Sequence, residues 1–425
     1  MTEQRAQADD RAVIVSTDGH ISPLLSEMRE YCPHEHLEAY DEFAAMRDAI
    51  REMTLTMVRE IPGGAYPEIL DTLDAAYHSR IEPRIPEMDR DGIAAEILFQ
   101  GSTNFEPLPF GANFAGARNE GADLAAEGQH IYNAWLADAV SVAPDRFLAL
   151  AQVPMWDIPA AVREVEWAAE AGFAGINFPA PRPELLHYDD PAWEPFWSAC
   201  AANDMLLASH SGGAADPADL NEFWYFQFEG GGAANRRALY RMIFGGVFHR
   251  HPTLRVMFTE QPGDWWRETM SEYDSVYLQY PQLRDPDKPY YCPNRPSEYC
   301  ASNVLIGASF LAPFEAHRAI DEGYARNVCW GRDFPHPEGT WKPHGAGEEP
   351  TTHLQLRYVF SEVEPGIVRD MVGGNVIREC NLDGDLLAKV AEQIDAPTYA
   401  ALGVPIDAIP ENAGIFSFRT VGAWG

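Results

Sequence analysis

Positively charged side chains are scarce in this chain, and lysine is the scarcest. Lysine and arginine together number 31 against 65 aspartates and glutamates, and the formal net charge is −34 at pH 7. Nucleic acids and anionic membranes repel such a surface, so neither is an expected partner. The only lysines are Lys288, Lys342 and Lys389. The earlier part of the chain therefore offers no lysine to bridge two metal ions or to form a Schiff base.

Paired cysteines and long apolar runs are also missing. The six cysteines are scattered without a C-x-x-C pair, which excludes a zinc-finger framework and a dense disulfide scaffold. No apolar run approaches the 18 residues of a membrane span, and the polar start lacks the apolar core of a signal peptide. We therefore expect a cytoplasmic protein. Hydrophobic residues make up 46% of the chain, which is enough for a large core.

Short apolar runs alternate with amphipathic stretches along most of the chain. The eight expected strands cover 12–17, Ile93–Phe99, Phe147–Val153, Ala174–Phe178, Met205–Ser209, Leu254–Thr259, Val304–Gly307 and Val328–Gly331. Most are separated by a helical stretch, a rhythm typical of parallel sheets. The pattern predicts an α/β protein with a (β/α)8 barrel. A doubly wound open sheet is the alternative, although no G-x-G-x-x-G follows any strand.

The extra length is expected in insertions and in a tail. Residues 21–90 form a mostly helical insertion after the first strand, and residues 211–232 and 335–352 form long loops after later strands. Loops that follow strands lie on the catalytic face of a barrel. We expect a barrel domain over 1–382 and a C-terminal extension over 383–425. The aromatic end of that extension needs a surface to bury against, on its own barrel or on a partner subunit.

Metal-ligating side chains recur where expected strands end. Asp18 and His20 follow the first strand, and alternate residues of a strand point to the same side. His210 ends the fifth strand, and Asp333 follows the eighth. The carboxyl ends of barrel strands meet at one mouth, so these four side chains can converge there. They predict a mixed nitrogen and oxygen site for one divalent ion, Zn²⁺ first and Mn²⁺ second.

Other side chains near the same mouth carry further predictions. Glu260 ends the sixth strand, where it is either a pocket carboxylate or a salt-bridge partner. His336 and Trp265 are candidate substrate contacts, with a loop hydrogen bond and core packing as the respective alternatives. Arg332 should point away from Asp333 and line the rim.

Three further groups are not expected to form sites. His34 and His36 enter a helical stretch, where alternate residues do not share a face. His249 and His251 precede the sixth strand and so lie at the opposite end of the barrel. The charged residues that lead into the second strand are expected to be solvated or to cap a helix; they are Arg84, Asp89, Arg90 and Asp91.

Several longer segments resemble the amidohydrolase superfamily, in particular the branch that includes aminocarboxymuconate-semialdehyde decarboxylase. They are Asp18-Gly-His20, Met88–Glu96, Asn133–Leu136, Pro144–Phe147, Phe244–Phe248, Glu260–Trp265 and Gly331–Gly339. The last, Gly-Arg-Asp-Phe-Pro-His-Pro-Glu-Gly, is the most specific. The resemblance implies a distorted TIM barrel whose ion is bound by Asp18, His20, His210 and Asp333.

Three functions follow as hypotheses. The first is a mononuclear metal-dependent hydrolase of a small organic substrate, in which Asp333 takes a proton from metal-activated water and Glu260 orients the substrate. The alternative is non-oxidative decarboxylation of an aromatic or unsaturated carboxylic acid. Glu260 stands where decarboxylases of this branch usually carry a histidine, which disfavours that alternative. The third is a barrel that binds a ligand without catalysis. We expect a homodimer or a higher homo-oligomer.

Overall fold

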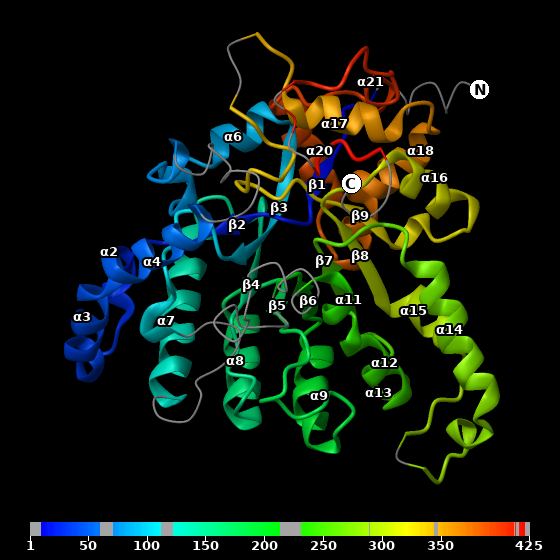
Figure 1. Ribbon diagram of the computed structural model, residues 1–425, viewed down its shortest axis with the longest axis horizontal. Helices are drawn as coiled ribbons and strands as arrows, with labels where there is room; N and C mark the ends of the chain where they lie inside the picture. Colours follow the sequence, from blue (N-terminus) through cyan, green and yellow to red (C-terminus); the bar gives the residue numbers. More distant parts are fainter. Residues whose placement is uncertain are drawn as a thin grey trace.

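A parallel barrel forms the centre of the protein. The computed structural model describes residues 10–59, 71–111, 122–212, 231–288, 290–343, 347–411, 413 and 416–420. The strands are β1 (Ile14–Ser16), β2 (His20–Ile21), β3 (Ile93–Gln100), β4 (Phe147–Ala151), β5 (Gly175–Asn177), β6 (Leu206–His210), β7 (Val256–Thr259), β8 (Val304–Ala308) and β9 (Val328–Trp330). Their order is β1-β3-β4-β5-β6-β7-β8-β9, with β2 beside β3 and every pair parallel (Figure 1). All eight expected strands are present, and the barrel prediction is confirmed.

Backbone contacts between the first and last strands nearly close the barrel. The Thr17 amide donates to the Trp330 carbonyl at 3.1 Å. Farther along, the Asp333 amide donates to the Asp18 carbonyl at 3.1 Å, and the His20 amide to the Phe334 carbonyl at 2.6 Å. The chain segments that carry the candidate ligands of the first and eighth strand ends are therefore joined directly.

Helices surround the strands in the order that the sequence predicts. Those between β3 and β9 are α7 (Ala122–Val140), α8 (Ile158–Glu170), α9 (Glu194–Ala202), α11 (Gly232–Asn235), α12 (Arg237–Phe244), α13 (Val247–Arg250), α14 (Trp266–Gln279), α15 (Pro296–Asn303) and α16 (Pro313–Asp321). One face of each strand packs against this ring, for example Ile176, Leu207 and Val256. The opposite face fills the barrel, where Ile97, Leu206 and similar residues interdigitate. None of the described helices is long and apolar enough to cross a membrane.

The insertion after the first strand is mostly helical where it is described. It contains α2 (Leu25–Met28), α3 (Leu37–Ala45), α4 (Arg47–Arg59) and α6 (Ile85–Arg90), and it forms one side of the molecule (Figure 1). The predicted loop over 211–232 lies mainly outside the described residues. His34, in a short 3-10 turn of the insertion, is exposed. At the amino-terminal side of β7, His251 pairs with Glu194 of α9 at 2.9 Å.

Arg84 and Asp91 stand at the N-cap and C-cap positions of α6, but the prediction that they are solvated is wrong. Both are buried and belong to a four-residue cluster, the buried quartet, with Glu96 and Arg332. Glu96 joins the two arginines, since its Oε1 lies 2.6 Å from Arg84 Nε and its Oε2 lies 2.8 Å from Arg332 Nε. Arg332 also contacts Asp91 at 3.1 Å. Arg332 therefore does not line the rim, because charges in a packed interior need partners of opposite sign.

The chain after β9 adds further helices around the barrel. It contains α17 (Thr351–Phe360), α18 (Pro365–Arg369), α19 (Asn375–Glu379), α20 (Gly384–Gln393) and α21 (Tyr399–Leu402). Val376 of α19 and Leu387 of α20 pack with the residues that fill the barrel. The domain boundary at residue 382 and the oligomeric state stay predictions.

Candidate metal centre

The ends of three barrel strands, β1, β6 and β9, bring the four predicted ligands to one place. Asp18 lies between β1 and β2, His20 begins β2, and Asp333 lies three residues beyond β9. His210 is the last residue of β6 and pairs in register with Thr259 of β7. Because all these strands are parallel, their carboxyl ends meet at the same mouth.

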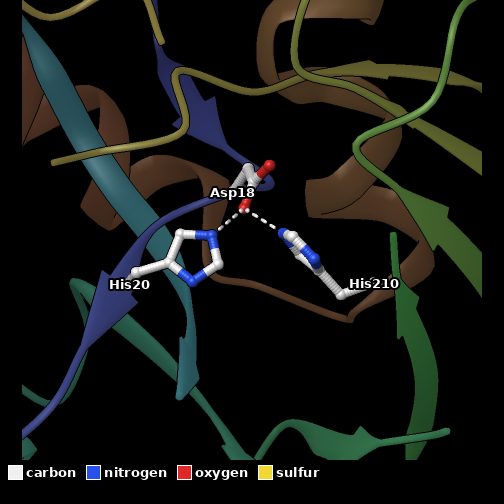
Figure 2. A group of neighbouring side chains, drawn as sticks. All are labelled: Asp18, His20 and His210. Carbon is white, nitrogen blue, oxygen red and sulfur yellow. Dashed lines mark ion pairs between the residues drawn. The ribbon is translucent and has the colours of Figure 1, made fainter. Parts of the chain in front are cut away.

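The side chains converge around the Asp18 carboxylate. Asp18 Oδ1 lies 3.1 Å from His20 Nε2 and 3.4 Å from His210 Nε2, and Figure 2 shows both imidazoles directed at it. His20 Nε2 also lies 3.2 Å from Asp333 Oδ1. Asp18, His20 and His210 form one group able to hold a metal ion, and His20, Asp333 and His336 form a second.

The ligand atoms fit a bound cation because the described residues outside the centre offer them no hydrogen bond. Asp18 Oδ1, His20 Nε2, His210 Nε2 and both Asp333 carboxylate oxygens are buried, and their near neighbours are one another and, for Asp333 Oδ1, His336 Nδ1 at 2.9 Å. Buried polar atoms without partners are costly, and several aimed at one point indicate a ligand between them. Two imidazole nitrogens and two carboxylates make a suitable donor set for Zn²⁺ or Mn²⁺.

The electrostatics of the same atoms also favour a cation. Burial opposes ionisation of Asp18, but the neighbouring His210 and His20 more than offset it, and the pKa of Asp18 lies well below its usual range. Burial lowers the pKa of His210, yet the Asp18 and Glu260 carboxylates raise it to about 9. The centre therefore keeps its carboxylate ionised and attracts positive charge.

Neighbouring groups orient the candidate ligands. The Ser309 hydroxyl, next after β8, donates to Asp18 Oδ2. His210 Nδ1 lies 2.6 Å from the Ser211 carbonyl, which makes Nδ1 the protonated nitrogen and leaves Nε2 free to ligate. His336 lies 2.9 Å from Asp333 Oδ1 through Nδ1 and 3.0 Å from the Gly101 carbonyl through Nε2. Because both its nitrogens are engaged, His336 is placed to orient Asp333.

A group of three carboxylates borders the centre. Glu260, Asp333 and Glu338 have oxygens within 4.8 Å of one another. Glu260 Oε2 also lies 3.6 Å from His210 Nδ1. Burial raises the pKa of Glu260 to about 8, against the lowering effect of His210 and with help from Asp333 and Asp18. A carboxyl group in this position holds its proton more readily than one in water.

Trp265 lies near the end of β7, just before α14. Its ring is buried and packs at 4.8 Å from the Arg236 guanidinium. Its Nε1 has no hydrogen-bond partner among the described residues. The predicted contact with substrate stays a prediction.

Sequence reasoning did not single out Ser309, Glu338 or Glu96. Ser309 follows β8 in the same way that Glu260 follows β7, so the strand-end rule could have found it. Glu338 belongs to the Gly331–Gly339 segment already noted for its resemblance. Glu96 is a lone charge inside an apolar strand, which is a signal for a buried ion pair.

Comparison with known proteins gives a family match and several relatives. A family profile described as amidohydrolase matches residues 19–378. The 2-amino-3-carboxymuconate-6-semialdehyde decarboxylase of Dictyostelium discoideum is 25% identical over 302 residues, which cover 71% of this chain and 76% of the relative. The gamma-resorcylate decarboxylase of Rhodococcus jostii is 25% identical over 292 residues, which cover 62% and 80% respectively.

Solved structures of low identity share the fold. The 5-carboxyvanillate decarboxylase of Novosphingobium aromaticivorans, with bound manganese and 3-methoxy-4-hydroxy-5-nitrobenzoic acid, superposes with a TM-score of 0.61 at 18% identity. The match covers 87% of this chain and 97% of that one. The sequence-based prediction of a hydrolase is therefore wrong, since both relatives named above are decarboxylases. The candidate ligands do not distinguish hydrolysis from decarboxylation, because the same ligand types serve both reactions.

Proposed function

This chain belongs to the amidohydrolase family, and from that premise we propose that it is a metal-dependent decarboxylase of an aromatic or unsaturated carboxylic acid. The convergence of Asp18, His20, His210 and Asp333 carries the proposal, because their ligand atoms are buried and hydrogen-bond to no described residue outside the centre. The decarboxylase relatives at 25% identity support this reaction over others of the superfamily.

These four side chains would hold one divalent ion. When bound, the ion supplies positive charge that anchors an acid substrate and stabilises the negative charge that develops on it. We propose Mn²⁺ because the related 5-carboxyvanillate decarboxylase structure contains manganese. The preference for Zn²⁺ derived from the ligand types is the alternative.

The protein's own task in such a reaction is to deliver a proton to carbon. The bond between the ring or alkene carbon and the carboxylate breaks, carbon dioxide leaves, and one proton replaces it without net consumption of water. We assign this proton transfer to Asp333 and Glu260, whose carboxylates border the same centre. His336, 2.9 Å from Asp333, orients that carboxylate.

The test is a search for carbon dioxide release. Protein reconstituted with Mn²⁺ is incubated in D₂O with hydroxybenzoic acids and unsaturated dicarboxylic acids, and amides and lactones serve as the hydrolase panel. We expect carbon dioxide from an acid, together with a product that carries deuterium at the carbon that lost the carboxylate. Cleavage of an amide or lactone without carbon dioxide release would refute the proposal.

Asp333→Asn isolates the role of one carboxylate. Asparagine keeps the shape but can neither carry the proton nor the charge, so we expect decarboxylation to fall by about 10²- to 10⁴-fold. Much of the Mn²⁺ should stay bound through the other three ligands, as measured by elemental analysis of the purified variant. Asp321→Asn, on the exposed end of α16, is the matched control and should keep full activity. Activity retained by Asp333→Asn contradicts the assignment.

A further inference from the structure

The last described residues of the chain lie against the mouth of the barrel. We call Phe416–Thr420 the C-terminal strap. Ser417, Phe418 and Arg419 are buried, and the Phe416 ring packs at 5.5 Å from Phe310, which follows β8. In Figure 1 this red end of the chain runs toward β8 and β9. The strap lies beyond residues 19–378, the part that matches the family profile.

Arg419 fixes the loop that follows β8. Its side chain is fully buried, and its Nη2 lies 2.5 Å from Oε2 of Glu315, which is also fully buried. Arg419 Nε and Nη2 donate to the Phe310 carbonyl at 2.9 and 2.7 Å. The neighbouring residue, Ser309, donates its hydroxyl hydrogen to Asp18 Oδ2. Arg419 therefore binds the residue next to Ser309, and Ser309 orients the candidate metal ligand Asp18.

Ser417 fixes the loop that follows β9. Its hydroxyl is shared between the Gly339 carbonyl at 2.5 Å and the Glu338 carbonyl at 3.0 Å. This loop closes on itself, because the Thr340 amide donates to the Arg332 carbonyl at 2.9 Å. Asp333, a candidate ligand, lies within the closed loop. Ser417 and Arg419 therefore connect the two loops that support Asp18 and Asp333.

We propose that Ser417 and Arg419 are positioning residues of the metal centre, and that the C-terminal strap sets how tightly the centre binds its ion. Asp18 and Asp333 lie on separate segments, and their spacing depends on how the two loops are held. The strap joins those loops by hydrogen bonds inside a buried interface, where such bonds hold their geometry. The inference rests on the metal site of the proposed function, but not on the decarboxylation.

The experiment measures Mn²⁺ affinity by electron paramagnetic resonance titration of the full-length protein. Ser417→Ala removes the bond to the β9 loop, and Arg419→Lys keeps the charge beside Glu315 but loses the paired donation to Phe310. We expect the Kd for Mn²⁺ to rise about 10-fold or more in each variant, as is usual when partners of metal ligands are lost. Ser417→Thr keeps the hydroxyl and should restore most of the affinity.

A matched control separates positioning from general stability. Arg357 also anchors the extension, through bonds to Glu349 and to the carbonyls of Val404 and Pro405. Arg357→Ala should lower the Tm measured without metal and leave the Kd for Mn²⁺ unchanged. If Ser417→Ala and Arg419→Lys bind Mn²⁺ as the unmodified protein does, the strap is only structural and the inference is wrong. If Arg419→Lys fails to fold, Ser417→Ala decides alone.

The two proposals fail in distinguishable ways. A protein that binds Mn²⁺ but releases carbon dioxide from no acid contradicts the proposed function, and the Kd values of the strap variants still decide this inference. A protein with measurable affinity for neither Mn²⁺ nor Zn²⁺ contradicts both.

Discussion

Gly19 lies between the candidate ligands Asp18 and His20, and other side chains fill the space where a β-carbon would point. A β-carbon added there would lie 2.5 Å from Cδ of Glu96 and 2.8 Å from Nη2 of Arg84. Both side chains are held in the buried quartet, so they have little freedom to move aside. The glycine therefore allows Asp18 and His20 to approach the quartet closely.

Gly19→Ala should consequently destabilise the protein by about 1–3 kcal/mol, the usual cost of overpacking a filled interior. We also expect a higher Kd for Mn²⁺, because the displaced backbone carries both ligands. Urea denaturation and Mn²⁺ titration measure the two effects. Gly384→Ala is the control, since among the described residues its β-carbon would meet only Ile377 Cγ2, at 3.4 Å. Equal stability of the two variants would show that the space at Gly19 can relax.

At the scale of elements, the buried quartet joins β3 to the segments that carry the metal centre. Arg84 Nη1 donates to the His20 carbonyl at 2.6 Å, and its Nη2 donates to the Phe334 carbonyl at 3.1 Å. The centre of the Phe334 ring lies 4.5 Å from the Arg84 guanidinium and 4.3 Å from the Arg332 guanidinium. Charged and aromatic contacts thus hold the chain segments after β1 and after β9 against β3, and Glu96 of β3 is the residue that both arginines share.

Glu96→Gln removes the charge that both arginines share. Loss of one partner from a buried ion pair costs about 3–5 kcal/mol, because the remaining charges are left without compensation. We expect a loss of that size in the free energy of unfolding, measured with urea. Glu349→Gln, which weakens the more exposed pair with Arg357, should cost less than about 1 kcal/mol. Comparable losses in the two variants would contradict a central role for Glu96.

The whole molecule carries a net charge of −34 and concentrates several carboxylates at the mouth of its barrel. An ion that binds only the folded chain stabilises it by mass action, so metal binding and folding are coupled. Metal binding should stabilise the fold as a whole, because the ligands Asp18, His210 and Asp333 come from segments that are far apart in the sequence.

Metal removal should therefore lower the Tm. At Mn²⁺ concentrations of 100 times the Kd, the expected stabilisation is about 2.7 kcal/mol. Calorimetry with Mn²⁺, and again after chelation with EDTA, measures the difference. His210→Ala should reduce the Mn²⁺-dependent shift, whereas His34→Ala, which changes an exposed histidine of the insertion, should keep it in full. An undiminished shift in His210→Ala would place the ion elsewhere.

The sequence by itself determined the barrel and the four candidate ligands. Apolar runs that alternate with amphipathic helices specify parallel strands, and the carboxyl ends of such strands meet at one mouth. The sequence alone therefore predicts that Asp18, His20, His210 and Asp333 lie close together. The choice of reaction was not determined in this way, because a hydrolase and a decarboxylase can share the same ligand types.

Only the tertiary structure decided which charges are buried and where the C-terminal strap packs. The sequence pattern predicts Arg84 and Asp91 at the surface, and their burial depends on ion pairs with Glu96 and with Arg332, of which Arg332 is remote in sequence. The sequence left open whether the aromatic tail packs on its own barrel or on a partner. In the structure Arg419 of the strap binds Phe310 and Glu315 of its own barrel. Local patterns specify strands and helices, whereas such contacts arise only when distant segments compete for the same buried space.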